Sequence, residues 1–226
     1  STGTCPRSLS LCETGEMRRL RLLRIQDVTH LCKHLGSSPN ELAHLCLKPE
    51  WYYRQGPRRI KGKTRHIATP QGRLRQILDR LQVLLQRVVL PESIHGGVKG
   101  HSPRTNAVVH LRKPVVLCMD IKDFFPSITN RRVYAMFRET LKCAPDVARI
   151  LTRLCTLNGS LPQGSPTSTI VAALSTVRLS NRLEQLANRH IATYTQYVDD
   201  VTISGPEHID RMVPLLGEII KQEGLR

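Results

Sequence analysis

Residues 192–205 read ATYTQYVDDVTISG, two runs of strand-forming residues with a pair of carboxylates between them. Tyr, Thr, Val and Ile favour strands, and Gly205-Pro206 ends the second run. The pattern predicts a short antiparallel hairpin that carries Asp199 and Asp200 at its turn. Two adjacent carboxylates repel each other and resist ionising together, so the question is what compensates them.

A third carboxylate, Asp120, ends the apolar run 115–119, which predicts a buried strand. A carboxylate buried there needs a cation or hydrogen-bond donors. Two Mg²⁺ ions would compensate the negative charge of the three carboxylates. They would also stabilise the attacking and leaving oxygens of a phosphoryl displacement. Because neighbouring strand residues alternate in direction, we expect Asp199 to share the face of Asp120, with Asp200 supporting the site more loosely. An Asx turn and a helix cap are the simpler explanation for an isolated Asp-Asp pair.

Positive charge dominates the chain and is concentrated in one region. The 226 residues include 34 Lys and Arg against 18 Asp and Glu, a net charge of +16. Residues 51–113 hold 14 of these cations and only two acidic residues. This concentration indicates a polyanionic partner, nucleic acid or an acidic membrane surface, rather than a merely solvated face. No apolar run approaches 18 residues, and the seven cysteines show no metal-binding spacing, so we expect reduced core cysteines in an intracellular protein.

The rest of the chain reads as helices on both sides of a small sheet, which predicts an α+β fold. A helix starting at Pro39 is expected to have Ser38 as its N-cap. A basic hairpin follows, with Lys61 and Lys63 at its tip. Apolar periodicity predicts the remaining helices, over residues 13–35, 73–90, 129–141, 145–156, 167–188 and 206–224.

Three motifs in order, MDIKDFFPSI (119–128), LPQGSPTS (161–168) and YVDD (197–200), resemble successive palm motifs of a reverse transcriptase. Within that family the chain looks most like the bacterial retron enzymes, through HGGVKGHS (95–102) and the Asn-Ala-x-x-His element (106–110). Val198 and Ser165 depart from the pattern, because retron enzymes commonly have Ala there.

The resemblance covers roughly residues 40–205 and implies the fingers and palm of a right-hand polymerase. It implies an N-terminal helical segment (1–50), basic fingers (51–113) and a palm (114–226) interleaved with fingers around 127–165. A small antiparallel palm sheet packed by helices would carry the carboxylates. The thumb that follows the palm in this family is expected to be missing from this chain.

The resemblance also implies roles for individual residues. Asp120, Asp199 and Asp200, assisted by the Ile121 carbonyl, would hold two Mg²⁺ ions, with Mn²⁺ as a substitute. Phe125 matches the bulky residue beneath the incoming sugar, where an aromatic ring leaves no space for a 2′-hydroxyl. The other residues implied to bind nucleotide are Lys61, Lys63, Arg65, Asp123, Phe124 and Gln163, and those implied to contact template or RNA are Arg104, Asn106, His110 and Gly164. As a glycine, Gly164 is expected to allow a close backbone approach.

Two of these implied roles have structural alternatives. On a helix Asn106 and His110 share one face, so they can equally form a structural pair. Ordinary core packing is the alternative for the two phenylalanines and suits Phe124 better than Phe125.

The implied activity is RNA-directed DNA synthesis in the bacterial cytoplasm, without a membrane partner. A retron enzyme would use a structured non-coding RNA as template and priming strand, make single-stranded multicopy DNA in phage defence, and bind dNTPs, an RNA–DNA hybrid and an effector protein. The alternatives are a reverse transcriptase from a group II intron or a CRISPR-linked system, a non-catalytic RNA-binding scaffold, and a two-metal nuclease. Retention of three carboxylates argues against the scaffold, and a nuclease has no need of LPQGSPTS.

Overall fold

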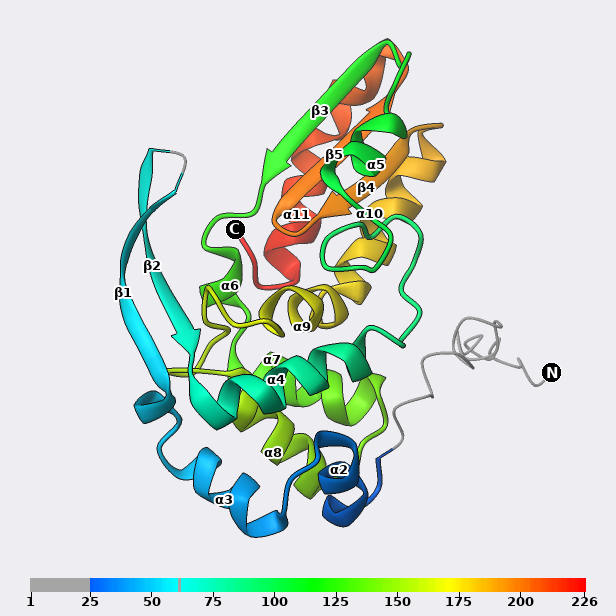
Figure 1. Cartoon of the computed structure of the whole chain (residues 1–226). Helices are drawn as coiled ribbons and strands as arrows, with labels where there is room; N and C mark the ends of the chain where they lie inside the picture. The colour runs from blue at the N-terminus through cyan, green and yellow to red at the C-terminus, as the bar shows by residue number, and fades with distance from the viewer. Residues whose placement is uncertain (1–24, 61) are drawn as a thin grey trace, which may run out of the picture.

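The computed structural model describes residues 25–60 and 62–226. It is an α+β arrangement in which helices surround two small antiparallel sheets, as the sequence predicts (Figure 1). Lys61 and residues 13–24 of the predicted first helix lie outside the described residues. No helix of the described part is both long and apolar enough to cross a membrane.

The first sheet is the predicted basic hairpin. Strands β1 (Tyr53–Ile60) and β2 (Lys63–Pro70) pair antiparallel along their whole length. At the base Tyr53, Ala68 and Pro70 are buried, while most residues farther out are exposed. The hairpin is therefore anchored in the core at one end and extends away from the rest of the chain (Figure 1).

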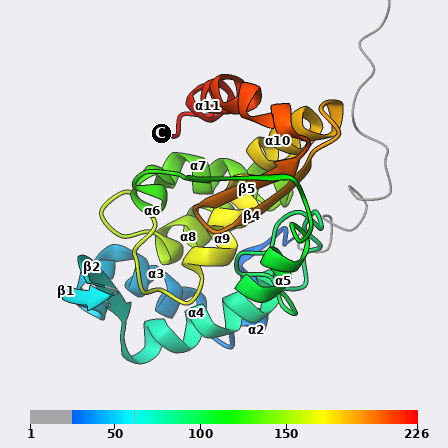
Figure 2. The ribbon, with the colours of Figure 1, turned by 90° about the horizontal axis from the view of Figure 1, so that it is seen from above.

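The second sheet has the strand order β3-β5-β4, formed by β3 (Val115–Asp120), β4 (Thr193–Tyr197) and β5 (Asp200–Gly205). The hairpin predicted for residues 192–205 is confirmed as β4 and β5. Helices α10 (Val177–Arg189) and α11 (Val213–Gln222) lie on one side of this sheet and α5 (Pro103–Val108) lies on the other (Figure 2). Strand β5 is central and buried from residue 201 to 205, so it fixes the position of the turn that precedes it.

The prediction of a buried strand over residues 115–119 is wrong in one respect. Strand β3 lies at the edge of the sheet and alternates between half-buried and exposed residues. Val116 is 47% exposed, and Cys118 is exposed beside Asp120 on the same face. A continuous apolar run predicts burial on both faces, but only one face of β3 packs against the body of the protein. Cys118 thus departs from the expected core position, which Cys32, Cys143 and Cys155 do occupy.

Three of the predicted helices have different bounds in the structure. The described part of the first helix starts only at Val28, because the Asp27 side chain caps it by accepting from the His30 N–H at 2.7 Å. Helix α4 ends at Leu85 rather than at residue 90. The predicted helix 167–188 is divided at Thr176, whose hydroxyl donates to the carbonyls of the preceding turn and competes with the regular pattern.

The predicted helix 129–141 ends in a π-helix (Met136–Thr140), and the predicted helix 206–224 begins as a 3-10 helix (Glu207–Met212) and is α-helical only over Val213–Gln222. The other bounds follow the sequence closely, and the predicted Ser38 cap of the helix that starts at Pro39 is present. The remaining elements in chain order are α2 (Val28–Leu35), α3 (Pro39–Leu47), the 3-10 helix η2 (Pro49–Tyr52), α4 (Gly72–Leu85), α6 (Phe124–Ser127), α7 (Asn130–Ala135), the π-helix η3 (Met136–Thr140), α8 (Pro145–Cys155), α9 (Ser168–Ser175) and the 3-10 helix η4 (Glu207–Met212).

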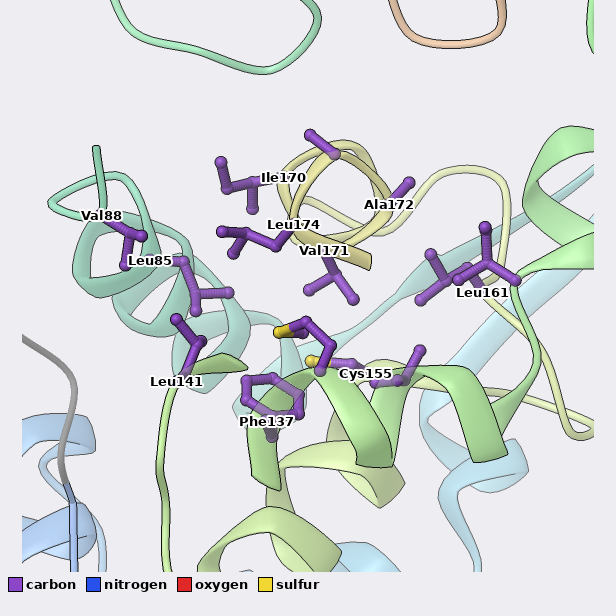
Figure 3. Packing of buried hydrophobic residues seen from close by; sticks show 14 of the residues in the cluster. Leu85, Val88, Phe137, Leu141, Cys155, Leu161, Ile170, Val171, Ala172 and Leu174 are labelled. Atoms are coloured by element: carbon purple, nitrogen blue, oxygen red, sulfur yellow. The ribbon is translucent and has the colours of Figure 1, made fainter. Parts of the chain in front are cut away.

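The main hydrophobic core lies beneath the sheets, where α4, α8 and α9 meet the π-helix. Phe137 sits at its centre and is fully buried, and Leu85, Cys155 and Val171 reach the same region from three different helices (Figure 3). Residues far apart in the sequence therefore share one core, which connects the base of the basic hairpin to the helices under the β3-β5-β4 sheet.

Arg73 of α4 joins α3 to this core. Its Nε lies 2.6 Å from Glu41 Oε1, and its Nη2 donates to the Gly36 carbonyl at 2.6 Å. Because Arg73 and then Ser37 donate hydrogen bonds to the carboxylate, the pKa of Glu41 is lowered from 4.5 to about 2. Folding therefore favours the ionised carboxylate.

We expect this contribution to stability to be complete above pH 4.5 and to be lost as the pH falls toward 2. The measurement is the melting temperature of the wild-type protein and of Glu41→Gln across this pH range. The wild-type advantage should shrink as Glu41 becomes protonated. A difference between the two proteins that stays constant from neutral pH to about pH 2 would contradict the prediction.

Candidate active site

Three carboxylates meet at one end of the β3-β5-β4 sheet. Asp120 on β3 and Asp200 on β5 are directly opposite each other in the antiparallel register, so their side chains share a face. Asp199 precedes β5 in the turn from β4. One oxygen from each of these three carboxylates lies within 4.8 Å of the others. The folded chain therefore gathers the three residues that the sequence singled out.

The register refines the expected roles of the two neighbouring carboxylates. Asp199 and Asp120 line the same cavity, but strand alternation is not the reason, because Asp199 lies in the turn outside β5. Asp200, however, is the direct cross-strand partner of Asp120. This relationship was not visible from the sequence, because it depends on how β3 aligns with β5. Asp200 is thus as closely tied to Asp120 as Asp199 is.

The turn that carries Asp199 has a strained backbone. Tyr197 pairs with Asp200, which leaves a two-residue loop of Val198 and Asp199. Two-residue hairpin loops need a positive φ at their first position, and Val198 has a φ of 60°. A β-branched residue in this region costs roughly 1–3 kcal/mol and persists only when its surroundings hold it there.

The electrostatics of the cluster favour a bound cation. Burial raises the pKa of Asp199. The negative charges of Asp200 and Asp120 raise the pKa of Asp199 further, and the positive charge of Arg65 lowers it. The Asp199 carbonyl also accepts from the Ile121 N–H at 2.9 Å, which ties the turn to the end of β3. Closely spaced carboxylate oxygens are the ligands that hard divalent cations prefer, and a cation would relieve the repulsion among them. The three carboxylates therefore fit a divalent metal site.

A cavity of about 520 Å³ opens in front of these carboxylates, within the size range of small-molecule sites. One side of it is acidic, and Arg65 from β2 contributes positive charge. The residues that line it come from β2, the segment from the end of β3 into the helix at Phe124–Ser127, the loop before α9 and the β4–β5 turn, namely Arg65, Asp120, Ile121, Asp123, Phe124, Pro126, Gln163 and Asp199. The cavity can therefore accommodate a molecule that carries both phosphate and metal-binding groups.

Arg58 is a candidate that sequence reasoning missed. It is directly opposite Arg65 in the β1–β2 register, so both guanidinium groups project from the same face of the hairpin. Like charges in this arrangement are destabilising unless an anion lies between them. Both arginines are visible in the sequence, but their alignment depends on the register of β1 against β2, which the sequence alone does not give. Lys63 lies at the first position of β2, and Lys61 lies outside the described residues.

The two phenylalanines occupy positions that differ from those expected. Phe124 is buried and lines the cavity, whereas Phe125 is half-buried, packs against the core and is not among the lining residues. Their ring centroids are 5.8 Å apart. Asp123 precedes them with a φ of 50° and starts α6. The sugar-excluding role of Phe125 stays a prediction, and Phe124 combines core packing with a place at the cavity wall.

The loop before α9 is fixed to the hairpin. The Gln163 carbonyl accepts from the Ala68 N–H at 2.7 Å. Gly164 has a φ of 113°, and a Cβ there would lie 2.7 Å from Ile67 Cγ2 and 3.0 Å from the Ala68 carbonyl oxygen. The expectation that glycine permits a close backbone approach is confirmed for β2. The predicted contact of Gly164 with the template stays a prediction.

The predicted RNA-contacting residues Arg104, Asn106 and His110 do not line the cavity. His110 follows α5 in a turn and is buried, with ring nitrogens 2.7 Å from the hydroxyls of Ser204 and Thr195. Burial and then Lys113 lower the pKa of His110. This histidine therefore fastens α5 to the polar face of the sheet, and an RNA contact through the same nitrogens would require breaking both bonds. Arg104 is exposed, and RNA contact by these three residues stays a prediction.

No family model matches the sequence. Several curated proteins do match it. The retron Se72 reverse transcriptase of Salmonella heidelberg (strain 579083-10) is 34% identical over 152 residues, which are 65% of this chain and 39% of that protein. The retron Mx65 reverse transcriptase of Myxococcus xanthus is 33% identical over 184 residues, 72% of this chain and 43% of that protein.

The retron Ec86 reverse transcriptase of Escherichia coli is 31% identical over an alignment 232 positions long, which covers 97% of this chain and 70% of that protein. The chain spans less than half the length of the Se72 and Mx65 proteins. The alignment with the Ec86 protein includes nearly every residue of the chain, and with it the carboxylates, the hairpin and the loop before α9. The chain belongs to the retron reverse transcriptases.

Proposed function

We propose that this chain provides the fingers and palm of an RNA-directed DNA polymerase that adds dNTPs to a primer. The observation that carries the proposal is the convergence of Asp120, Asp199 and Asp200 within 4.8 Å beside a cavity that also contains Arg65. Nucleotidyl transfer needs carboxylate oxygens at the reacting phosphate and positive charge at the leaving phosphates. Both line the same cavity, the carboxylates through Asp120 and Asp199 and the positive charge through Arg65.

In this proposal the three carboxylates, assisted by the Ile121 carbonyl, hold two Mg²⁺ ions, for which Mn²⁺ substitutes. The ions supply stabilisation of the attacking and leaving oxygens. Arg65 and Arg58 neutralise the triphosphate, because guanidinium groups bind phosphate oxygens in a bidentate manner. Gln163 contacts the nascent base pair from the loop that is fixed to β2. Phe125, supported by its contact with Phe124, excludes the 2′-hydroxyl of a ribonucleotide.

The division into parts is also a proposal. Residues 51–113 act as fingers and residues 114–226 act as palm, with residues 127–165 returning to the fingers. The exposed cations of the hairpin support this division, because an RNA template and an RNA–DNA hybrid are polyanions. The described helices of residues 25–50 pack against α4 and α8, away from the tip of the hairpin (Figure 1).

The relatives support a retron enzyme over the other bacterial reverse transcriptases, since each of the three is named as one. We therefore propose a structured non-coding RNA as template and primer, single-stranded DNA as product and a role in phage defence with an effector protein in the bacterial cytoplasm. A non-catalytic scaffold would gain nothing from three mutually repelling carboxylates, which would only destabilise it.

The test is primer extension on an RNA template with dNTPs and Mg²⁺, comparing the wild-type protein with Asp199→Asn/Asp200→Asn. The wild-type protein should extend the primer, and the variant should give only background because it has lost two of three metal ligands. Equal extension by the two proteins would exclude these carboxylates as the catalytic centre. Cleavage of the supplied nucleic acid without dNTPs would assign the site to a nuclease instead.

A further inference from the structure

The turn that carries Asp199 is contacted by a segment that lies outside the strands β3, β4 and β5. Residues 93–96 pair in parallel with the free edge of β4. The Gln196 N–H donates to the Ser93 carbonyl at 2.8 Å, and the Gln196 carbonyl accepts from the N–H groups of His95 at 2.8 Å and Gly96 at 3.3 Å. The segment therefore forms one isolated parallel bridge, between Ile94 and Gln196, beside the turn.

Gly96 approaches the turn so closely that only glycine fits. A Cβ at this position would lie 2.2 Å from the backbone nitrogen of Val198 and 2.9 Å from its Cα. These atoms belong to the backbone, so they cannot move aside as a flexible side chain would. The backbone of Gly96 thus lies directly against the residue that holds the positive φ of 60°.

A second contact reaches the same residue from within β4. The Gln196 side chain is buried, and its Nε2 donates to the Val198 carbonyl at 2.9 Å. The Tyr194 hydroxyl donates to Gln196 Oε1 at 3.1 Å and fixes the orientation of the amide. Burial raises the pKa of Tyr194, so the hydroxyl keeps its proton and remains a donor. Val198 is therefore held at its nitrogen side by Gly96 and at its carbonyl by Gln196.

We propose that Gly96 and Gln196 are positioning residues that hold the Val198–Asp199 turn in its strained conformation and so set the separation of the three carboxylates. A strained backbone persists only where its neighbours determine it. Without these contacts Val198 relaxes toward a negative φ, and the carboxylate of Asp199 rotates relative to that of Asp120. The catalytic consequence rests on the proposed function, whereas the effect on metal binding does not.

The test measures Mn²⁺ binding by electron paramagnetic resonance, without nucleic acid or nucleotide, using the full chain. Gly96→Ala displaces the turn, and Gln196→Met removes the bond to the Val198 carbonyl at nearly constant volume. We expect each variant to bind Mn²⁺ about 10- to 100-fold more weakly than the wild-type protein, the range seen when partners of metal ligands are removed. Both variants should still unfold cooperatively on heating.

Gly217→Ala is the matched control. Gly217 lies in α11, and a Cβ there meets nothing within 4 Å. The Mn²⁺ affinity and the activity of the Gly217→Ala protein should therefore equal those of the wild-type protein. In primer extension, Gly96→Ala and Gln196→Met should lower kcat by a similar factor at saturating dNTP and leave the KM for dNTP within about twofold, because the phosphate-binding arginines are untouched.

Two results would overturn the proposal. Folded Gly96→Ala and Gln196→Met proteins with wild-type Mn²⁺ affinity would show that the turn keeps its geometry without these contacts. Loss of cooperative unfolding in both variants would show that the contacts serve folding and not the position of the carboxylates. A failure of the proposed function would look different. In that case Asp199→Asn/Asp200→Asn would extend primers as well as the wild-type protein does. The Mn²⁺ affinities of Gly96→Ala and Gln196→Met would still test the role of the turn.

Discussion

Replacing Asp120 with asparagine is expected to reduce primer extension on the order of 10³-fold or more while making the metal-free protein more stable. Asparagine keeps the shape of the side chain but removes one of three negative charges within 4.8 Å of one another. Metal ions then lose a ligand, so the transition state loses stabilisation. The apo protein loses a repulsion of about 1 kcal/mol, which corresponds to a rise in melting temperature of about 2–4 °C.

The measurement pairs steady-state primer extension with thermal unfolding in the presence of a chelator. Asp146→Asn serves as the control, because Asp146 lies on α8, 76% exposed, and pairs only with Arg149 among the ion pairs of the described residues. This control should retain activity and show no rise in melting temperature. A drop in melting temperature for Asp120→Asn would mean that this carboxylate supports the fold, in conflict with a site built for a cation.

The second large effect concerns the core beneath the site. Phe137 belongs to the π-helix and is fully buried among residues of α4, α8 and α9 (Figure 3). Phe137→Ala should lower the free energy of unfolding by about 3–5 kcal/mol, since it removes a large apolar side chain and leaves a cavity. This is a large part of the 5–15 kcal/mol that is typical of a folded domain.

Urea unfolding followed by circular dichroism measures this loss. The control is Leu215→Ala on α11, where the side chain is 50% exposed and the expected change is within about 0.5 kcal/mol. Activity per folded molecule of Phe137→Ala should stay near that of the wild-type protein at low temperature, because Phe137 does not line the cavity. A loss below about 1 kcal/mol would show that the surrounding helices close over the missing ring.

Local patterns in the sequence predicted the parts of the fold that depend on local forces. The two runs of strand-forming residues within 192–205 sufficed to predict the β4–β5 hairpin, and Ser38 sufficed for the start of α3. The strand before Asp120 was also predicted, because apolar β-formers precede it. These features depend on backbone preferences over a few residues, which do not change with distant contacts.

Features that depend on distant pairing could not be predicted. The alignment of Asp120 with Asp200 and of Arg58 with Arg65 is a matter of strand register, which a composition of strand formers leaves open. The glycine of LPQGSPTS was expected to allow a close approach, but only the fold shows that Ile67 and Ala68 approach it. The exposed face of β3 was missed for the same reason.

The pairing of β3 with β5 has a consequence for how the protein becomes active during folding. Asp120 and Asp200 stand 80 positions apart in the chain, and between them lie α6 to α10 and β4. Contacts of such high contact order form late, because closing a long loop costs entropy before the pairing returns any stabilisation. The metal-binding cluster therefore comes into existence only at the end of folding. If the proposed polymerase activity is recovered after dilution from denaturant, we expect it to follow completion of the β3-β5-β4 sheet, later than the helical signal.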